Sequence, residues 1–314
     1  MFYDFNEDID NIYVPDEFAE ITSLLRLHRR EVQTKILKLL DFNEDCEESK
    51  KQLMEIIRYA ISFGGRHYRS FFVRILGESF EINKPRILFI GAIIEMLHSY
   101  ILMQNEMPDI ENNDYRCDKM TCHRKFGNAK TMIASNALIT LIMDLLANNK
   151  SVKIDGDTRC KLVSIVTKYS GKDGVSGGQM MNIILKRKQN HSQDEETRIR
   201  KLKINSLFNA GAECIEILAG TSVAQNLAIK SYINNICNLI NIYDEFIKNK
   251  EGNLNELLKR AKLFTLQGSA SVAKLPNNKN FISFIRYNKY CIEKLLNCGN
   301  SSGPVIVQSD IATI

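Results

Sequence analysis

The sequence predicts an all-α protein, and three observations support this prediction. Apolar residues recur at spacings of three and four along most of the 314 residues. Only five prolines and sixteen glycines interrupt the chain, so sharp turns are few. No run alternates between apolar and polar residues for long enough to predict a sheet. We therefore expect about ten to eleven helices.

The first predicted helix begins after Pro15, because proline and the acids Asp16 and Glu17 suit a first helical turn. Its apolar face comprises Phe18, Ile21, Leu24, Leu25 and Leu27. The same spacing predicts further helices at residues 47–62, 69–80, 85–105, 128–147, 157–170, 175–187, 203–219, 222–248, 253–268 and 279–297. We expect residues 1–298 to form a single domain and residues 299–314 to form a tail.

The composition excludes several classes of protein. Apolar residues make up 44% and charged residues 25%, which is typical of globular proteins and excludes disordered and fibrous chains. The net charge of +5, with both signs interspersed, predicts no nucleic-acid partner, although it permits an anionic ligand. A helical scaffold that binds nucleic acid through its basic loop is a weaker alternative, since no aromatic residues interleave with the basic ones.

The sequence favours a cytoplasmic protein without a transmembrane segment. The longest apolar runs, Ile87–Ile94 and Ala137–Met143, are far shorter than the roughly 18–20 residues that span a bilayer. The first 25 residues carry seven acids and no Lys or Arg, the opposite of a signal peptide. The eight cysteines are scattered without a Cys-x-x-Cys pair, which indicates buried thiols in a reducing compartment.

Polar residues line one face of the predicted helix 85–105. Glu95, His98 and Asn105 fall at helical spacing on an otherwise apolar helix. They either pair with neighbours inside the core or line a polar site. The acid-rich segment that follows, including Glu106 and Glu111, is either a solvated loop or a set of oxygen ligands for Mg²⁺.

Two further patterns leave alternatives open. Asn234, Asn238 and Asn241 form a stripe on the helix 222–248, which is either an exposed face or the wall of a wet cavity. Arg66 and Arg69 follow a glycine pair and make either a fork suited to phosphate or an ordinary surface pair.

The order of these motifs resembles the trans-type isoprenyl diphosphate synthases, in particular the bacterial short-chain farnesyl diphosphate synthases. The resemblance spans about residues 50–268. It is strongest from Glu95-Met96-Leu97-His98-Ser99-Tyr100 to Asp114-Tyr115-Arg116, and it continues through Gly177-Gly178-Gln179 and Ile217-Leu218-Ala219-Gly220. It implies a helical bundle around a deep central cavity, a homodimer, and a prenyltransferase that uses Mg²⁺.

The resemblance also implies a role for each matching position. Arg66, Arg69 and His98 would bind isopentenyl diphosphate; Arg116 and Lys203 would bind the allylic diphosphate; Lys203 and Asn241 would occupy catalytic positions; Glu106, Glu111 and Asp244 would bind Mg²⁺; and Tyr100 would form the floor that limits chain length. Such chemistry needs metal and cationic groups to stabilise the departing diphosphate, and an apolar cavity to shield the carbocation.

The sequence departs from the family pattern where metal would bind. Asn105 replaces the first aspartate of the first acidic motif, and Lys248 replaces the last aspartate of the second, four residues after Asp244. The lysine expected after the second motif is either Lys259 or Lys262. Two hypotheses therefore stay open. The protein is either a working but metal-weakened prenyltransferase, or a catalytically inactive member that binds prenyl diphosphates or partners another subunit.

Overall fold

The structure, a computed structural model, describes residues 14–41, 47–63, 65–116, 119–187, 192–248 and 253–298. The side chains of residues 193, 243, 244, 247, 248, 297 and 298 are outside this description, and so is the predicted tail 299–314.

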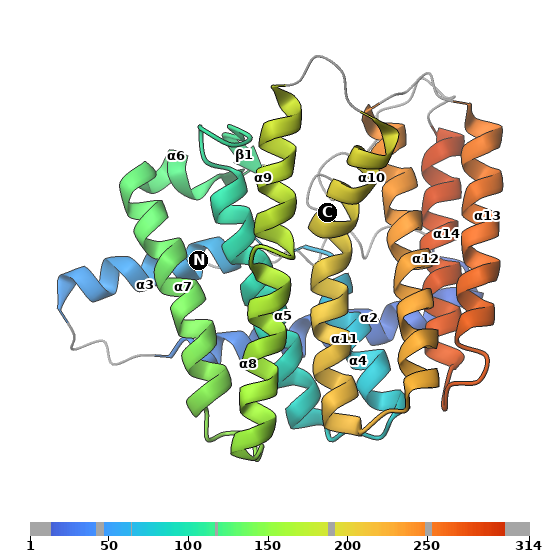
Figure 1. The fold of residues 1–314 in the computed structure, drawn as a ribbon, viewed down its shortest axis with the longest axis horizontal. Coiled ribbons are helices and arrows are strands. Elements are labelled where there is room, and N and C mark those ends of the chain that lie inside the picture. Colours follow the sequence, from blue (N-terminus) through green and yellow to red (C-terminus); the bar gives the residue numbers. More distant parts are fainter. Residues whose placement is uncertain are drawn as a thin grey trace.

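The described part of the chain is an all-α bundle, which confirms the predicted fold class (Figure 1). It has eleven α-helices of twelve residues or more, which confirms the predicted number. They are α2 (Ala19–Leu39), α3 (Glu48–Ile61), α4 (Tyr68–Ser79), α5 (Lys84–Asn105), α7 (Asn128–Asn148), α8 (Gly156–Ser170), α9 (Val175–Lys186), α11 (Ser206–Ala219), α12 (Val223–Lys248), α13 (Leu254–Ser271) and α14 (Lys279–Cys298). The 3₁₀ turn η1 (Asp16–Phe18) precedes α2.

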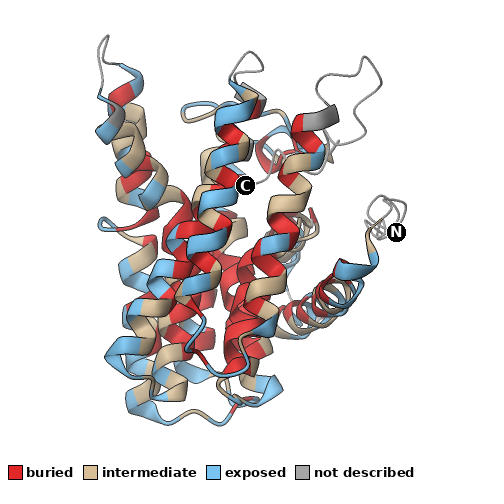
Figure 2. Cartoon of the chain, turned by 90° about the vertical axis from the view of Figure 1, so that its right-hand side faces the viewer, coloured by how far each residue is buried: buried red, intermediate tan, exposed pale blue. Residues whose placement is uncertain are grey.

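The two central helices are α4 and α5. Eleven of the twelve residues of α4 are buried, and α5 is buried on almost every side from Phe89 to Leu97. Helices that are apolar all round belong in the core, because they have no polar face to turn to water. Helices α2, α3, α7 and α11 pack around α5, and the buried residues concentrate on the inner faces of the bundle (Figure 2).

Two helices are long and apolar enough to cross a membrane by length and composition alone. No uninterrupted apolar run of the sequence reaches this length, but α5 and α7 qualify because their average hydropathy is high over eighteen residues. In α5, 67% of that window is buried inside the protein, as in the core helix of a globular bundle. The corresponding value for α7 is 39%, so much of this apolar helix faces outward.

Two short helices and two short strands were not predicted. Helix α6 (Cys122–Phe126) and the antiparallel pair β1 (Tyr115–Arg116) and β2 (Lys119–Met120) follow the acid-rich segment. Helix α10 (Gln193–Arg200) lies in a stretch that the sequence analysis left as a gap between helices. The sequence feature that marks the start of α10 is a capping box. The Ser192 hydroxyl accepts a hydrogen bond from the Glu195 backbone amide, and the Glu195 carboxylate accepts one from the Ser192 backbone amide.

Helix α10 continues without a break through a π-helix, η2 (Lys201–Asn205), into α11. Gly178 of α9 lets this π-helix approach closely. A Cβ at Gly178 would lie 2.7 Å from the Leu202 Cβ and 3.4 Å from its carbonyl carbon. The glycine therefore fixes the distance between α9 and the segment that carries Lys203.

We expect the substitution Gly178→Ala to destabilise the protein. The added methyl group meets a Cβ that cannot move without its backbone, and such overpacking costs about 1–3 kcal/mol. Alanine regains about 1 kcal/mol through its higher helix propensity, so the net loss is up to about 2 kcal/mol. Urea denaturation measures it. The control is Gly156→Ala, which adds a methyl group where no heavy atom lies within 4 Å. Equal stability of the two variants would contradict the close-approach argument.

Candidate functional site

The predicted first acidic motif lies at the C-terminal end of α5. The helix ends at Asn105, with Glu106 as its C-cap residue, and Pro108 follows in the turn. The chain then turns through Glu111 into β1, which carries Arg116. Figure 1 shows β1 in the upper half of the bundle. The residues predicted for metal and for diphosphate therefore come from neighbouring segments.

Arg116 and Glu106 form a buried ion pair. The Arg116 Nη1 atom lies 2.8 Å from the Glu106 Oε1 atom, and both side chains are less than a tenth exposed. The pKa of Glu106 is raised to about 7, mainly by burial; Arg116 opposes the rise and nearby Glu111 adds to it. The Arg116 guanidinium also lies 4.1 Å above the centre of the Phe63 ring.

Lys203 and Glu111 form a second, more exposed pair. The Lys203 ammonium donates to the Glu111 Oε1 atom at 3.0 Å. The amide of Gln179 donates to the same oxygen at 3.4 Å. Gly178 and Gln179 belong to the predicted glycine–glycine–glutamine motif. Gly178 permits the close approach of η2, and Gln179 hydrogen-bonds to Glu111, the partner of Lys203.

The structure thus pairs each predicted metal ligand of the first motif with a predicted diphosphate-binding cation. Carboxylate oxygens are suitable Mg²⁺ ligands, and one or two of them commonly suffice when substrate phosphates complete the coordination. Glu106 and Glu111 fit this requirement, since both supply carboxylate oxygens and lie close enough to interact electrostatically. Among the described residues, no group of three or more His, Cys, Asp or Glu side chains gathers to hold a metal.

His98, Arg69 and Glu95 form a polar cluster deeper between α4 and α5. Burial, Arg69 and Arg116 hold the pKa of His98 well below its usual range, so this imidazole is neutral at pH 7. Burial opposes ionisation of Glu95, but His67, His98 and the Ser70 amide outweigh it and keep its pKa well below the usual value. Glu95, on the face predicted for α5, is therefore paired with groups at the start of α4.

The cluster is held by a residue in the left-handed conformation. His67 has a φ of +52° and forms the N-cap of α4, where its Nδ1 atom lies 3.1 Å from the Glu95 Oε2 atom. The Ser70 amide donates to the other oxygen of Glu95 at 3.2 Å, and the Ser70 hydroxyl lies 2.9 Å from the Nε2 atom of His28 in α2. These bonds fix the start of α4, which carries Arg69.

Arg66 faces a different group of side chains. Its guanidinium lies 5.6 Å over the Tyr68 ring and acts on the pKa values of Tyr68, Tyr287 and Cys291. The structure therefore brings Arg69 and His98 together, whereas Arg66 lies toward α14.

The remaining predicted residues divide into three cases. Tyr100 is half-buried on α5, packs against the core and hydrogen-bonds with Gln104. The buried Oδ1 atom of Asn241 has no hydrogen-bond partner among the described residues. The side chains of Asp244 and Lys248 lie outside the described residues, so the second motif is not placed. The asparagine stripe is exposed at Asn234 and becomes partly buried toward Asn241.

A residue that the sequence analysis did not single out contacts the second motif. Arg260 of α13 donates to both carboxylate oxygens of Glu245, at 3.1 and 3.0 Å. Its sequence neighbours Lys259 and Lys262, which were considered for this region, are exposed. No local pattern identifies Arg260, because the partner acid lies on another helix.

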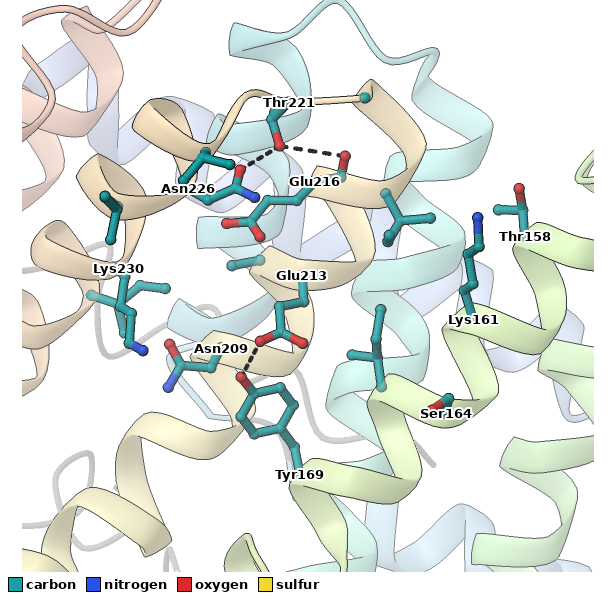
Figure 3. A pocket seen from close by; sticks show the side chains of 17 residues that line it. Thr158, Lys161, Ser164, Tyr169, Asn209, Glu213, Glu216, Thr221, Asn226 and Lys230 are labelled. Carbon is teal, nitrogen blue, oxygen red and sulfur yellow. Dashed lines mark hydrogen bonds between the residues drawn. The ribbon is translucent and has the colours of Figure 1, made fainter.

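A pocket of about 790 Å³ lies between α8, α11 and α12, and none of the predicted site residues lines it (Figure 3). The predicted central cavity stays a prediction. In this pocket Glu213 accepts hydrogen bonds from Tyr169 and Lys168, and Thr221 donates to Asn226. Burial and the nearby charge of Glu213 together raise the pKa of Glu216 to about 7.

A model of the polyprenyl synthetase family matches residues 50–256 of the chain. Farnesyl diphosphate synthases from Buchnera aphidicola and Escherichia coli are each 28% identical to it, over 165 and 168 residues; the alignments cover 52% and 54% of this chain and 56% of each relative. The chain thus spans about half the length of these curated relatives. A probable farnesyl diphosphate synthase from Bradyrhizobium diazoefficiens is 23% identical over 88% of this chain and 80% of its own.

Solved structures share the fold. The FPP/GFPP synthase of Zymomonas mobilis superposes with a TM-score of 0.79 at 24% identity, over 86% of this chain and 99% of its own. The geranyltransferase of Legionella pneumophila superposes with a TM-score of 0.78 at 18% identity, over 92% of this chain and 100% of its own. At such identities the likeness establishes the helical architecture alone.

The raised pKa of Glu216 predicts a pH-dependent stability. Because the folded state binds this proton more tightly than the unfolded state, Glu216 contributes stability that is lost as the pH rises from about 4.5 through about 7. The variant Glu216→Gln mimics the protonated form. We expect it to be more stable than the unsubstituted protein at pH 8, with the difference vanishing near pH 4.5.

Urea denaturation across this pH range measures the effect. Glu55→Gln, which changes an exposed acid on α3, serves as the control. A pH-independent difference between Glu216→Gln and the unsubstituted protein would contradict the prediction.

Proposed function

The chain belongs to the polyprenyl synthetase family, and we propose that it acts as a short-chain isoprenyl diphosphate synthase. In this proposal it condenses isopentenyl diphosphate with an allylic diphosphate such as dimethylallyl or geranyl diphosphate. The observation that carries the proposal is the convergence of four groups at the end of α5. Two acids, Glu106 and Glu111, face the two cations Arg116 and Lys203.

Arg116 and Lys203 bind the allylic diphosphate in this proposal. Each leaves a carboxylate of its own chain and turns to phosphate oxygens, with which guanidinium and ammonium groups make charge-assisted hydrogen bonds. The low exposure of Arg116 strengthens such a bond, because little water competes for the guanidinium. When bound by the freed Glu106 and Glu111, Mg²⁺ supplies positive charge that stabilises the departing diphosphate.

Arg69 and His98 take the diphosphate of the second substrate, isopentenyl diphosphate. A neutral imidazole beside a buried guanidinium can donate a hydrogen bond to a phosphate oxygen without adding a second charge to the core. Arg66 belongs to this group in the proposal only if its side chain turns from Tyr68 toward Arg69. Asp244 completes the metal site, Asn241 contributes its unpaired amide oxygen to the catalytic site, and Tyr100 limits product length.

The proposal includes a cytoplasmic homodimer with no nucleic-acid partner and no transmembrane segment. The outward face of α7 supports a second copy as its partner, since Met132 and Ile133 are 56% and 58% exposed there. We take residues 1–298 as one catalytic domain, which is supported by an apolar core that extends from Phe18 to Leu296.

We expect Lys203→Gln to lower turnover strongly. The protein is incubated with Mg²⁺, isopentenyl diphosphate and geranyl diphosphate, and chromatography measures the prenyl product. Loss of one cationic donor to the leaving group lowers the catalytic rate by about 100- to 1,000-fold. Lys201→Gln is the matched control, because it removes the same charge from an exposed position of the same π-helix.

Two outcomes would change the proposal. No product above a no-enzyme control, with geranyl or dimethylallyl diphosphate, would exclude the prenyltransferase. Binding of pyrophosphate in calorimetry without turnover would then favour the inactive family member. An equal loss of turnover in Lys201→Gln and Lys203→Gln would instead show that Lys203 has no specific role.

A further inference from the structure

Two aromatic rings at the C-terminal end of α3 lie directly beside the candidate site. Tyr59 and Phe63 stand four residues apart, and their ring centres are 5.0 Å apart at an angle of 82°. Phe63 is only 1% exposed. The rings therefore form a rigid pair whose positions are set by the core of the bundle.

Each ring contacts the segment that carries Arg116. The Arg116 guanidinium lies 4.1 Å above the Phe63 ring centre. The Tyr59 hydroxyl donates to the backbone carbonyl of Met120 at 2.7 Å, and Met120 pairs with Tyr115 across the β1–β2 ladder. On the same side, the Lys125 ammonium lies 3.8 Å from the Tyr59 ring centre. The end of α3 thus contacts the hairpin formed by β1 and β2 in two ways. Phe63 contacts the side chain of Arg116, and Tyr59 hydrogen-bonds to the backbone of Met120.

We propose that Phe63 is a positioning residue, whose ring face holds the Arg116 guanidinium in place for an incoming diphosphate while Tyr59 clamps the hairpin. This inference rests on the proposed function, because it assumes that Arg116 binds a diphosphate. It concerns a residue outside the motifs that the family resemblance identifies.

The physical reason is that Arg116 has two partners of different kinds. Its ion pair with Glu106 must open before the guanidinium can contact a phosphate. The Phe63 ring needs no such exchange, since a π face attracts a cation without occupying its hydrogen-bond donors. The ring therefore keeps the guanidinium desolvated and limits its rotamers in both states, which lowers the entropic cost of binding.

The test measures the binding of inorganic pyrophosphate to the full chain by isothermal titration calorimetry in the presence of Mg²⁺. Phe63→Leu and Phe63→Met keep an apolar side chain but remove the ring face. We expect each to raise the dissociation constant about 3- to 30-fold, the range of a partly to fully desolvated cation–π contact. Tyr59→Phe, which removes only the hydroxyl, should raise it about 2- to 10-fold.

A double-mutant cycle separates positioning from packing. In the Arg116→Gln background, Phe63→Leu should leave the dissociation constant unchanged, because no guanidinium remains to be held. Phe281→Leu is the packing control: Phe281 is equally buried but makes edge-to-face contacts with Phe72 and Tyr232. It should lower thermal stability without weakening pyrophosphate binding.

The outcomes distinguish this inference from the proposed function. If the unsubstituted protein binds no pyrophosphate, the proposed function fails and this inference fails with it. If the unsubstituted protein binds, but the Phe63 variants bind equally well or lose affinity equally in the Arg116→Gln background, the inference alone is overturned. If both Phe63 variants fail to fold, Tyr59→Phe provides the test. Unchanged pyrophosphate binding by the folded Tyr59→Phe variant would overturn the proposed role of α3 in holding the hairpin that carries Arg116.

Discussion

The arrangement of the candidate site depends on the buried ion pair between Arg116 and Glu106. Removing both charges from water is costly, and a lone buried charge would be costlier still, so each residue requires the other. Because Glu106 caps α5 and Arg116 lies in β1, the pair joins the central helix to the hairpin. The Phe63 ring closes the remaining side of the guanidinium. The two ends of the acid-rich segment are therefore part of the packed structure, whereas its middle is exposed at Asp109, Asn112 and Asn113.

The helices could be predicted because their cause is local. Apolar spacing along 69–80 and 85–105 corresponds to the buried faces of α4 and α5, within one residue at each end. Helix α10 has no apolar stripe, and only its capping box marks it. The strands β1 and β2 are two residues long, which is too short for any alternation to appear.

The candidate site could be predicted only in part, for the same reason. Glu95 and His98 share a helix face, so their spacing alone placed them together. The partners that neutralise the acids come from distant segments: Lys203 is 92 residues from Glu111, and Arg260 reaches Glu245 from the next helix. Neither pairing leaves a local pattern. The side chains of Asp244 and Lys248, at the two ends of the second motif, lie outside the described residues.

The π-helix before α11 has a consequence for how this site can change. A π turn holds one residue more than an α turn, so a single residue can be deleted from it while the helix stays continuous. Such a deletion would convert the π turn into an ordinary α turn and would leave the flanking helices in register, because the wide turn accommodates the extra residue. Lys203 stands inside this turn, so a one-residue change of length can redirect its ammonium away from Glu111. The chain could thus lose or regain this cation by a length change in η2, with every other residue of the site unaltered.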